Sequence, residues 1–225
     1  MKRIALVTMI FMLAMCMSVC AFAAQTVYLD ASGEGGAYTT LPEAAEAVDN
    51  GGTIIVSGNT TTPTTAYALP AKNITITSEN GAVLTLGRVL IASGDLKFEN
   101  ITIQNGTTAN VDFIYANGHD LTIGEGVTTV ASTSTKRHIS LATGLNTGTC
   151  AGSGTVTVKS GTWRNVYGGN YQGTFSGSAN IVFDGGILSG GNLILGNVSK
   201  GTNTASVTLT VNGGIVTAIK GGTIP

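Results

Sequence analysis

Short segments in which apolar and polar residues alternate recur along the whole chain. Each segment carries two apolar residues two positions apart, and these pairs are Ile54 with Val56, Ile74 with Ile76, Leu96 with Phe98, Leu121 with Ile123, Val156 with Val158, Ile181 with Phe183 and Val207 with Leu209. Because successive side chains of a β-strand point to opposite faces, each pair predicts a short strand with one buried face. The steps between successive pairs are 20, 22, 25, 35, 25 and 26 residues. Steps of this length are typical of the coils of a solenoid.

The last third of the chain shows the repeat most clearly. Residues 155–169 align without a gap with residues 208–222, an offset of 53, and residues 180–191 form a looser copy between them. A β-sandwich would also give short alternating strands, but it has no reason to place equivalent turn residues at a constant spacing. We therefore predict an all-β fold, a right-handed single-stranded parallel β-helix.

A short polar residue stands before each apolar pair from the second pair onward. These residues are Asn73, Asp95, Asp120, Thr155, Asn180 and Ser206. Side chains of this kind hydrogen-bond backbone groups at turns. Stacked coils would therefore align them in a ladder along one corner of the solenoid.

One segment near the beginning predicts an α-helix. Thr40 and Glu43 have the spacing of a capping box, and Pro42 falls in the first turn. The apolar stripe of this helix consists of Leu41, Ala44, Ala45 and Val48. The sequence Asn50-Gly51-Gly52 ends it. The first coil of a solenoid exposes apolar side chains and an unpaired strand edge, so we expect this short N-terminal helix to cap it.

The first 23 residues have the pattern of a secretory signal peptide. Lys2 and Arg3 precede an apolar run at residues 4–19, and Ala21 and Ala23 supply the small residues before a cleavage site. The alternative of a transmembrane anchor is disfavoured because a run of 16 residues is shorter than the ~20 that span a bilayer. A lipoprotein cut before Cys20 is a second alternative. We predict a signal peptide at residues 1–23, one β-helix domain at residues 24–225, and a bacterial protein that is secreted or held at the cell surface.

The net charge and the cysteine count of the exported chain exclude some classes of partner and of covalent cross-link. Residues 24–225 carry 9 Lys and Arg against 12 Asp and Glu, a net charge of 9 − 12 = −3. A nucleic-acid partner is therefore not expected. Cys150 is the one cysteine left after cleavage, so an intramolecular disulfide is excluded for the exported chain. We expect no cofactor and no membrane span after cleavage.

The first part of the exported chain resembles a known family. Residues 27–33 (VYLDASG) and 37–41 (AYTTL), then Glu43-Ala44 and residues 51–54 (GGTI), are similar to the first segment of pectin-lyase-like β-helix proteins. The later coils, punctuated by Gly-Gly, resemble bacterial surface or adhesin-like members of that superfamily. The resemblance implies the fold. It leaves the activity open, because lyases, hydrolases, esterases and non-enzymatic binding proteins share this fold.

Residues with catalytic or metal-binding character are sparse. The chain has no Asp-Asp pair and no acidic cluster on a predicted strand, where lyases and hydrolases of such a fold carry theirs, so no catalytic residue is assigned. Asp95 and Asp120 lie one coil apart and could share a cation, but we assign them to the turn ladder and predict no metal site. The 35-residue step predicts a loop of about ten extra residues. That loop would hold Lys136, Arg137, His138 and Cys150.

The best candidate for a ligand site is an aromatic and amide-rich segment. It consists of Trp163, Arg164, Tyr167, Asn170, Tyr171 and Gln172. Sugar rings stack on aromatic faces and hydrogen-bond to amides and guanidinium groups. Trp163 stands at the repeat position of Leu188 and Val216, so a place in the core is the alternative for it. Tyr167 aligns with Lys220, which predicts an outward ring.

These observations favour an exported, non-catalytic β-helix surface protein that is adhesin-like or binds a glycan or a cell-surface partner. The alternatives are a polysaccharide lyase or glycoside hydrolase of the pectin-lyase-like superfamily, and a structural spacer of a larger surface protein. The last predicted coil ends at residues 221–224 without a polar cap. We therefore expect either a chain truncated at this end or end-to-end self-association.

Overall fold

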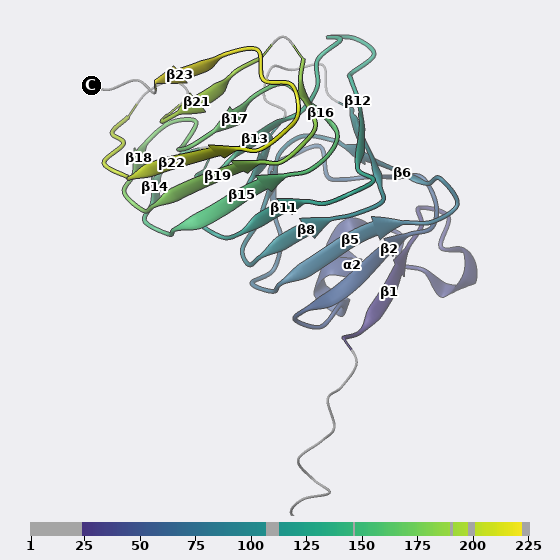
Figure 1. The fold of residues 1–225 in the computed structure, drawn as a ribbon. Coiled ribbons are helices and arrows are strands. Elements are labelled where there is room, and N and C mark those ends of the chain that lie inside the picture. The colour runs from purple at the N-terminus through teal and green to yellow at the C-terminus, as the bar shows by residue number, and fades with distance from the viewer. Residues whose placement is uncertain (1–23, 107–112, 146, 190, 198–200, 222–225) are drawn as a thin grey trace, which may run out of the picture.

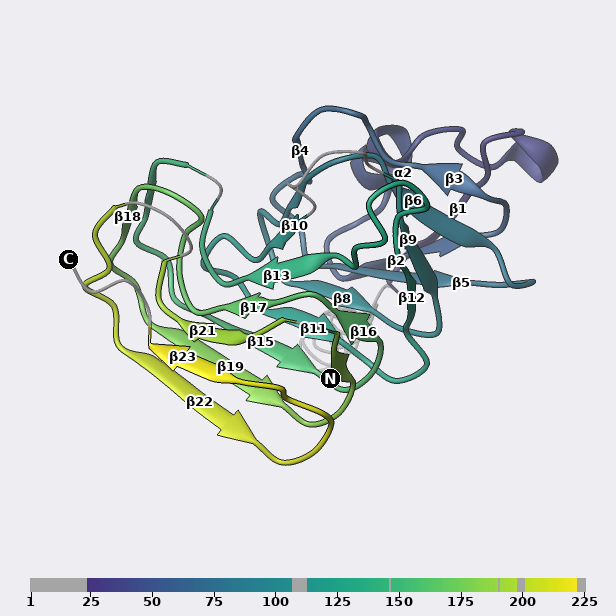
Figure 2. The ribbon, with the colours of Figure 1, turned by 90° about the horizontal axis from the view of Figure 1, so that it is seen from above.

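The protein is a parallel β-solenoid in which each turn of the chain adds one strand to each of several sheets (Figures 1 and 2). The computed structural model describes residues 24–106, 113–145, 147–189, 191–197 and 201–221. The signal peptide predicted at residues 1–23 lies outside the described residues. The predicted parallel β-helix architecture is confirmed.

The largest sheet has eight strands, and its order follows the chain. Its strands are β1 (Thr26–Leu29), β2 (Gly52–Val56), β5 (Ile74–Ser78), β8 (Leu96–Phe98), β11 (Leu121–Ile123), β15 (Gly154–Val158), β19 (Ala179–Phe183) and β22 (Val207–Val211). All neighbours in it are parallel. We call it the eight-stranded sheet.

Two further sheets complete the wall of the solenoid. The seven-stranded sheet consists of β4 (Tyr67–Ala68), β7 (Leu90–Ile91), β10 (Phe113–Tyr115), β13 (Ser140–Ala142), β17 (Val166–Tyr167), β21 (Leu193–Leu195) and β23 (Ile219–Gly221). The four-stranded sheet consists of β3 (Thr60–Thr61), β6 (Val83–Leu86), β9 (Thr102–Asn105) and β12 (Thr128–Val130). In the later coils two-stranded sheets form the remaining sides. These are β14 (Thr149–Cys150) with β18 (Thr174–Phe175), and β16 (Thr162–Trp163) with β20 (Ile187–Leu188).

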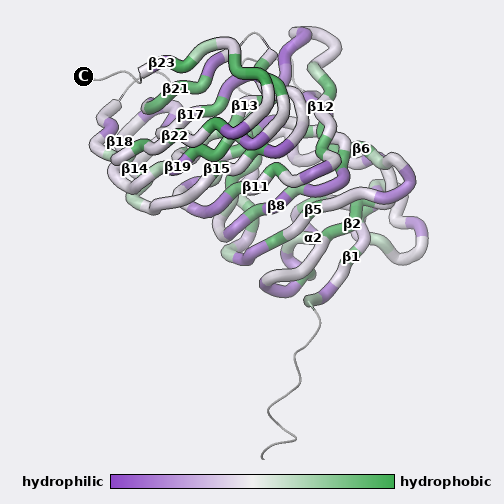
Figure 3. The backbone as a smooth tube through the Cα atoms, in the orientation of Figure 1, coloured by the Kyte–Doolittle hydropathy of each residue, from purple (hydrophilic) through white to green (hydrophobic). Residues whose placement is uncertain are grey.

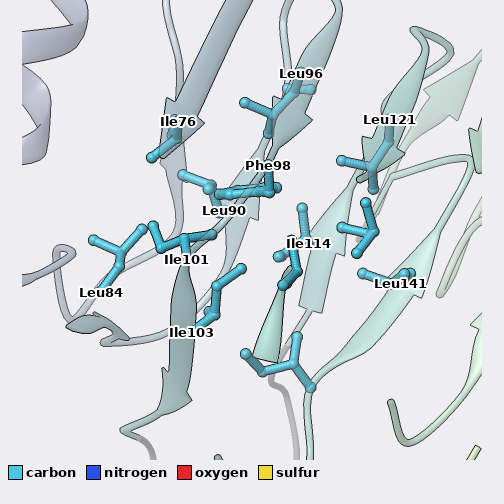
Figure 4. Close-up of a cluster of buried hydrophobic side chains, with 14 of the residues drawn as sticks. Ile76, Leu84, Leu90, Leu96, Phe98, Ile101, Ile103, Ile114, Leu121 and Leu141 are labelled. Carbon is cyan, nitrogen blue, oxygen red and sulfur yellow. The ribbon is translucent and has the colours of Figure 1, made fainter. Parts of the chain in front are cut away.

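The core is a set of apolar columns that run along the solenoid. One column of the eight-stranded sheet contains, in register, Val27, Ile54, Ile76, Phe98, Ile123, Val158, Phe183 and Val211. Side chains from the three larger sheets meet inside the coils (Figure 4). Hydrophobic and hydrophilic residues alternate along the strands, as strands with one buried face require (Figure 3).

The register differs from the prediction at both ends. Ile54 pairs with Ile76 rather than Ile74, and Ile181 pairs with Leu209 rather than Val207. The steps there are therefore 22 and 28 residues instead of 20 and 26. A slip of two residues keeps every side chain on its face, so the predicted core faces are right although the register is wrong.

The predicted helix is present as α2 (Leu41–Ala47), preceded by the 3-10 helix η1 (Glu34–Gly36). The capping box is complete: the Thr40 hydroxyl accepts from the Glu43 backbone N–H, and the Glu43 carboxylate accepts from the Thr40 backbone N–H. The helix buries Leu41 and packs beside β1 at the first coil. It ends at Ala47, before the predicted Asn50-Gly51-Gly52 stop, because Val48 already has extended backbone angles.

The structure does not have the single projecting loop that was predicted for the long step between Ile123 and Val156. The extra residues form a compact turn and a short strand instead. After β12 the chain makes a compact turn in which the Ser132 N–H donates to the Arg137 carbonyl and the Lys136 N–H donates to the Ser132 carbonyl. Cys150 does not project in a loop, because it lies in β14, which pairs with β18 of the next coil. It is buried as a free thiol.

Candidate binding groove

Trp163 belongs to the core. Its side chain is 0% exposed, and its indole Nε1 donates to the Ser160 carbonyl over 2.9 Å. It pairs in register with Leu188, and the neighbouring Ile187 bridges to Ile215, so the repeat alignment of Trp163 with Leu188 and Val216 is right. A ring with no exposed face cannot stack on a sugar, so the core alternative replaces the ligand role predicted for Trp163.

Tyr167 lies outside the main core, as its alignment with Lys220 predicts, but its ring is not exposed. Only 6% of the residue is accessible. Its ring centroid lies 5.6 Å from that of Phe113, which stacks on Tyr115 at 5.0 Å. Burial raises the pKa of Tyr167. Aromatic rings from strands on either side of β13 therefore cover the outer face of the seven-stranded sheet here, and the expectation of an exposed Tyr167 is wrong.

Asn170 holds the backbone of three segments together and is 0% exposed. Its Oδ1 accepts from the Leu145 N–H over 2.8 Å, and its Nδ2 donates to the Gly148 and Thr174 carbonyls over 3.2 and 2.9 Å. The Asn170 amide is therefore fully used in hydrogen bonds to the backbone and has no exposed surface for a ligand. Arg164, Tyr171 and Gln172 remain half-buried. They are the part of the predicted aromatic site that a ligand could touch.

The predicted turn ladder is present at the corner before the eight-stranded sheet. The Oδ1 of Asn73 accepts from the Asp95 N–H, that of Asp95 from the Asp120 N–H, and that of Asp120 from the Thr155 N–H, over 2.9, 3.1 and 2.7 Å. Further along, the Thr208 hydroxyl donates to Asn180 Oδ1 over 2.8 Å. Thr208, not Ser206, occupies the last rung, because Asn180 pairs with Thr208.

Two open depressions follow this ladder, and Asp120 lines both. The first, of about 270 Å³, is lined by Gly51, Asn73, Ile74, Thr75, Asp95, Leu96, Lys97, Asp120 and Thr122. The second, of about 410 Å³, is lined by Asp120, Ser153, Gly154, Thr155, Ser178, Ala179, Asn180, Ser206 and Thr208. Because they share Asp120 and follow one corner, we treat them as one groove that runs from the corner before β2 to β22, and we call it the ladder groove.

The ladder groove offers hydroxyl, amide and carboxylate groups. Asp95 and Asp120 each use one oxygen in the ladder, and the second oxygen of each has no protein partner among the described residues. Lys97 is the one cationic residue of the lining, and its ammonium forms an ion pair with Glu99. The local charge is therefore negative, which disfavours an anionic ligand.

The described residues contain no group of three or more His, Cys, Asp and Glu placed to hold a metal ion. Burial raises the pKa of the Cys150 thiol and lowers that of His138.

A third depression, of about 430 Å³, lies beside β1 and is lined in part by Asp30, Glu34 and Glu79. Asp30 and Glu34 are near each other in the sequence, but Glu79 comes from a later coil, so the sequence pattern did not indicate this group.

Comparison of the chain with protein-family models, with curated proteins and with solved structures gives no match. The resemblance to pectin-lyase-like proteins therefore stays a prediction. Within the described part of the chain, no helix has the length and apolar character needed to cross a membrane.

Proposed function

We propose that this protein is an exported, non-catalytic binding protein that holds an extended, uncharged glycan along the ladder groove. The observation that supports this most is the continuity of the groove, whose two depressions share Asp120 and together follow the eight-stranded sheet. A long open groove suits a chain molecule better than a small, enclosed ligand.

The spacing of the groove suits a polymer with a short repeat. Neighbouring parallel strands lie about 4.8 Å apart, so the rungs of the ladder repeat at that distance. One pyranose unit of an extended glycan has a similar length. Hydroxyl groups can donate and accept hydrogen bonds, as can the hydroxyls of sugars, so threonines of the lining supply compatible partners. Thr75 and Thr122 lie two strands apart with Lys97 between them, and Thr155 lies in the ladder row on β15.

Charge indicates which glycans are favoured. A chain of uronic acids would bring carboxylates beside Asp95 and Asp120, and like charges at close range are unfavourable. Neutral glycans avoid this repulsion. The groove therefore favours neutral glycans over the acidic substrates typical of uronate lyases.

The decisive experiment compares two threonines of strand β5. Thr75 and Thr77 are both half-buried on the outer face, but only Thr75 lines the ladder groove. After a glycan array identifies a ligand, Thr75→Val should weaken binding about fivefold, because one hydrogen bond contributes about 1 kcal/mol. Thr77→Val should leave the affinity unchanged. Equal weakening by both variants would exclude the groove as the site.

The same experiment separates the alternative functions. Asp120→Asn keeps the Oδ1 acceptor of the ladder and removes a negative charge, so it should reduce the discrimination against uronate oligosaccharides. Release of reducing sugar or unsaturated product would replace the binding proposal with the lyase or hydrolase alternative. Absence of binding to every glycan on the array would favour the spacer alternative.

A further inference from the structure

Among the described residues, no segment covers the core at the last coil. The column of inward side chains that contains Phe183 at 0% exposure ends at Val211, which is 45% exposed. In the seven-stranded sheet, Leu193 at 0% is followed by Ile219 at 54%. Strands β22 and β23 lie at this end, away from α2 (Figures 1 and 2).

Strand β22 also has an unpaired edge. In the described structure it pairs with β19 on one side and with no strand on the other. Natural edge strands are commonly protected by charged residues or proline. The sequence of β22, Val207-Thr208-Leu209-Thr210-Val211, contains neither.

The sequence of β22 is a palindrome, Val-Thr-Leu-Thr-Val, centred on Leu209. In an antiparallel pair centred on Leu209, Val207 of one copy lies opposite Val211 of the other, and Thr208 lies opposite Thr210. Directly opposed residues point to the same face of a sheet. The inward valines and leucine of both copies would therefore close one core, and the threonines would continue one outer face.

The backbone supports the same register. The Asn212 N–H donates to the Phe183 carbonyl, so Asn212 faces β19. Backbone groups alternate in direction along a strand, and Val207, Leu209 and Val211 therefore point their N–H and C=O groups to the free edge. In the register centred on Leu209 these residues face each other as the hydrogen-bonded pairs of an antiparallel ladder.

We propose that two copies of this chain join through β22 in an antiparallel, two-fold symmetric pair. A two-fold contact uses the same surface of both copies and is closed. Head-to-tail growth is disfavoured because α2 packs beside β1 at the other end and buries Leu41. The assembly is therefore a dimer, in contrast to open-ended association.

Analytical ultracentrifugation of the full chain over a range of concentrations tests the closed assembly. The expected result is a monomer–dimer equilibrium with a twofold limit in mass. Val211→Lys would place charges in the joined core and should abolish the dimer, whereas Thr210→Lys, with the same charge on the outer face, should retain it. A monomer at all concentrations, or species that keep growing, would overturn the proposal.

Cysteine cross-linking tests the register without perturbing the core. Thr208 and Thr210 of opposite copies would lie close enough for a disulfide, whereas two copies of Thr208 would lie too far apart. An equimolar mixture of Thr208→Cys and Thr210→Cys should form a cross-linked dimer on oxidation, and each variant alone should not. Equal cross-linking of a single variant would show a different arrangement.

Discussion

The two ends of the solenoid differ in how their outermost strand is covered. Val27 and Val211 occupy the same column of the eight-stranded sheet, at its first and last strands. Val27 is 6% exposed and Val211 is 45% exposed. The difference arises because α2 buries Leu41, Ala44 and Ala45 at the first coil, while no described element covers the last. The exposed fraction of a valine in this column therefore depends on whether another element packs against its strand.

The first end is also held by a lysine from the next coil. The Lys72 ammonium donates to the carbonyls of Ala45, Glu46 and Val48 over 3.3, 2.6 and 2.9 Å. These carbonyls belong to the end of α2, where a helix has unpaired acceptors and a partial negative charge. A cation at this position stabilises the helix and fixes it to the second coil.

The largest expected effect is the difference in stability loss between truncating a leucine at the first end and truncating a leucine at the last end. Leu41→Ala removes a fully buried side chain of α2 and should lower the free energy of unfolding by about 2–5 kcal/mol. Leu209→Ala, at the half-buried last coil, should cost about 1 kcal/mol or less. Urea unfolding measures both, at a concentration where the chain is monomeric. Equal losses would mean that the last coil is as well covered as the first.

A smaller effect is expected when the cation is removed from the helix end. Lys72→Met keeps the length of the side chain but leaves three carbonyls without their donor, and should lower the free energy of unfolding by about 1–2 kcal/mol. Lys159→Met, at an exposed position directly after β15, is the matched control and should change it by less than about 0.5 kcal/mol. A loss in Lys72→Met no larger than in the control would contradict a capping role.

The fold was predictable from the sequence because a register error of two residues leaves each side chain assigned to the correct face of its strand. Ile74 and Ile76 share a face, so pairing Ile54 with the wrong one left the core prediction intact. The 53-residue repeat offset carried more information than the apolar pairs, because it placed Thr155 on Thr208 and thus implied the observed last rung. Strand pairs alone gave a register two residues too short there.

The candidate site was less predictable, because exposure at outward positions depends on neighbouring coils. Tyr167 points out of its sheet, yet Phe113 from an earlier coil covers its ring. The spacing of Trp163, Tyr167 and Tyr171 cannot show this, since Trp163 points inward and Tyr167 outward. The ladder was visible as turn residues, but the groove beside it depends on how the corner backbones stack.

The smallest expected effect concerns the ionisation of Glu43 in the capping box of α2, a helix that the described structure has at the first end and not at the last. Glu43 Oε2 accepts from the Thr40 hydroxyl, the Thr39 hydroxyl and the Thr40 N–H, and these hydrogen bonds hold the pKa of the carboxyl below its usual 4.5. A carboxyl with a lowered folded-state pKa stabilises the protein above its unfolded pKa, and this contribution is lost as the pH falls through the folded value. Glu43→Gln keeps a capping-box acceptor without the charge. The melting temperature of the native chain should therefore exceed that of Glu43→Gln above pH 4.5, and the difference should shrink as the pH falls below it. A difference in melting temperature that stays constant from neutral pH into this acidic range would show that the carboxylate charge does not stabilise the cap.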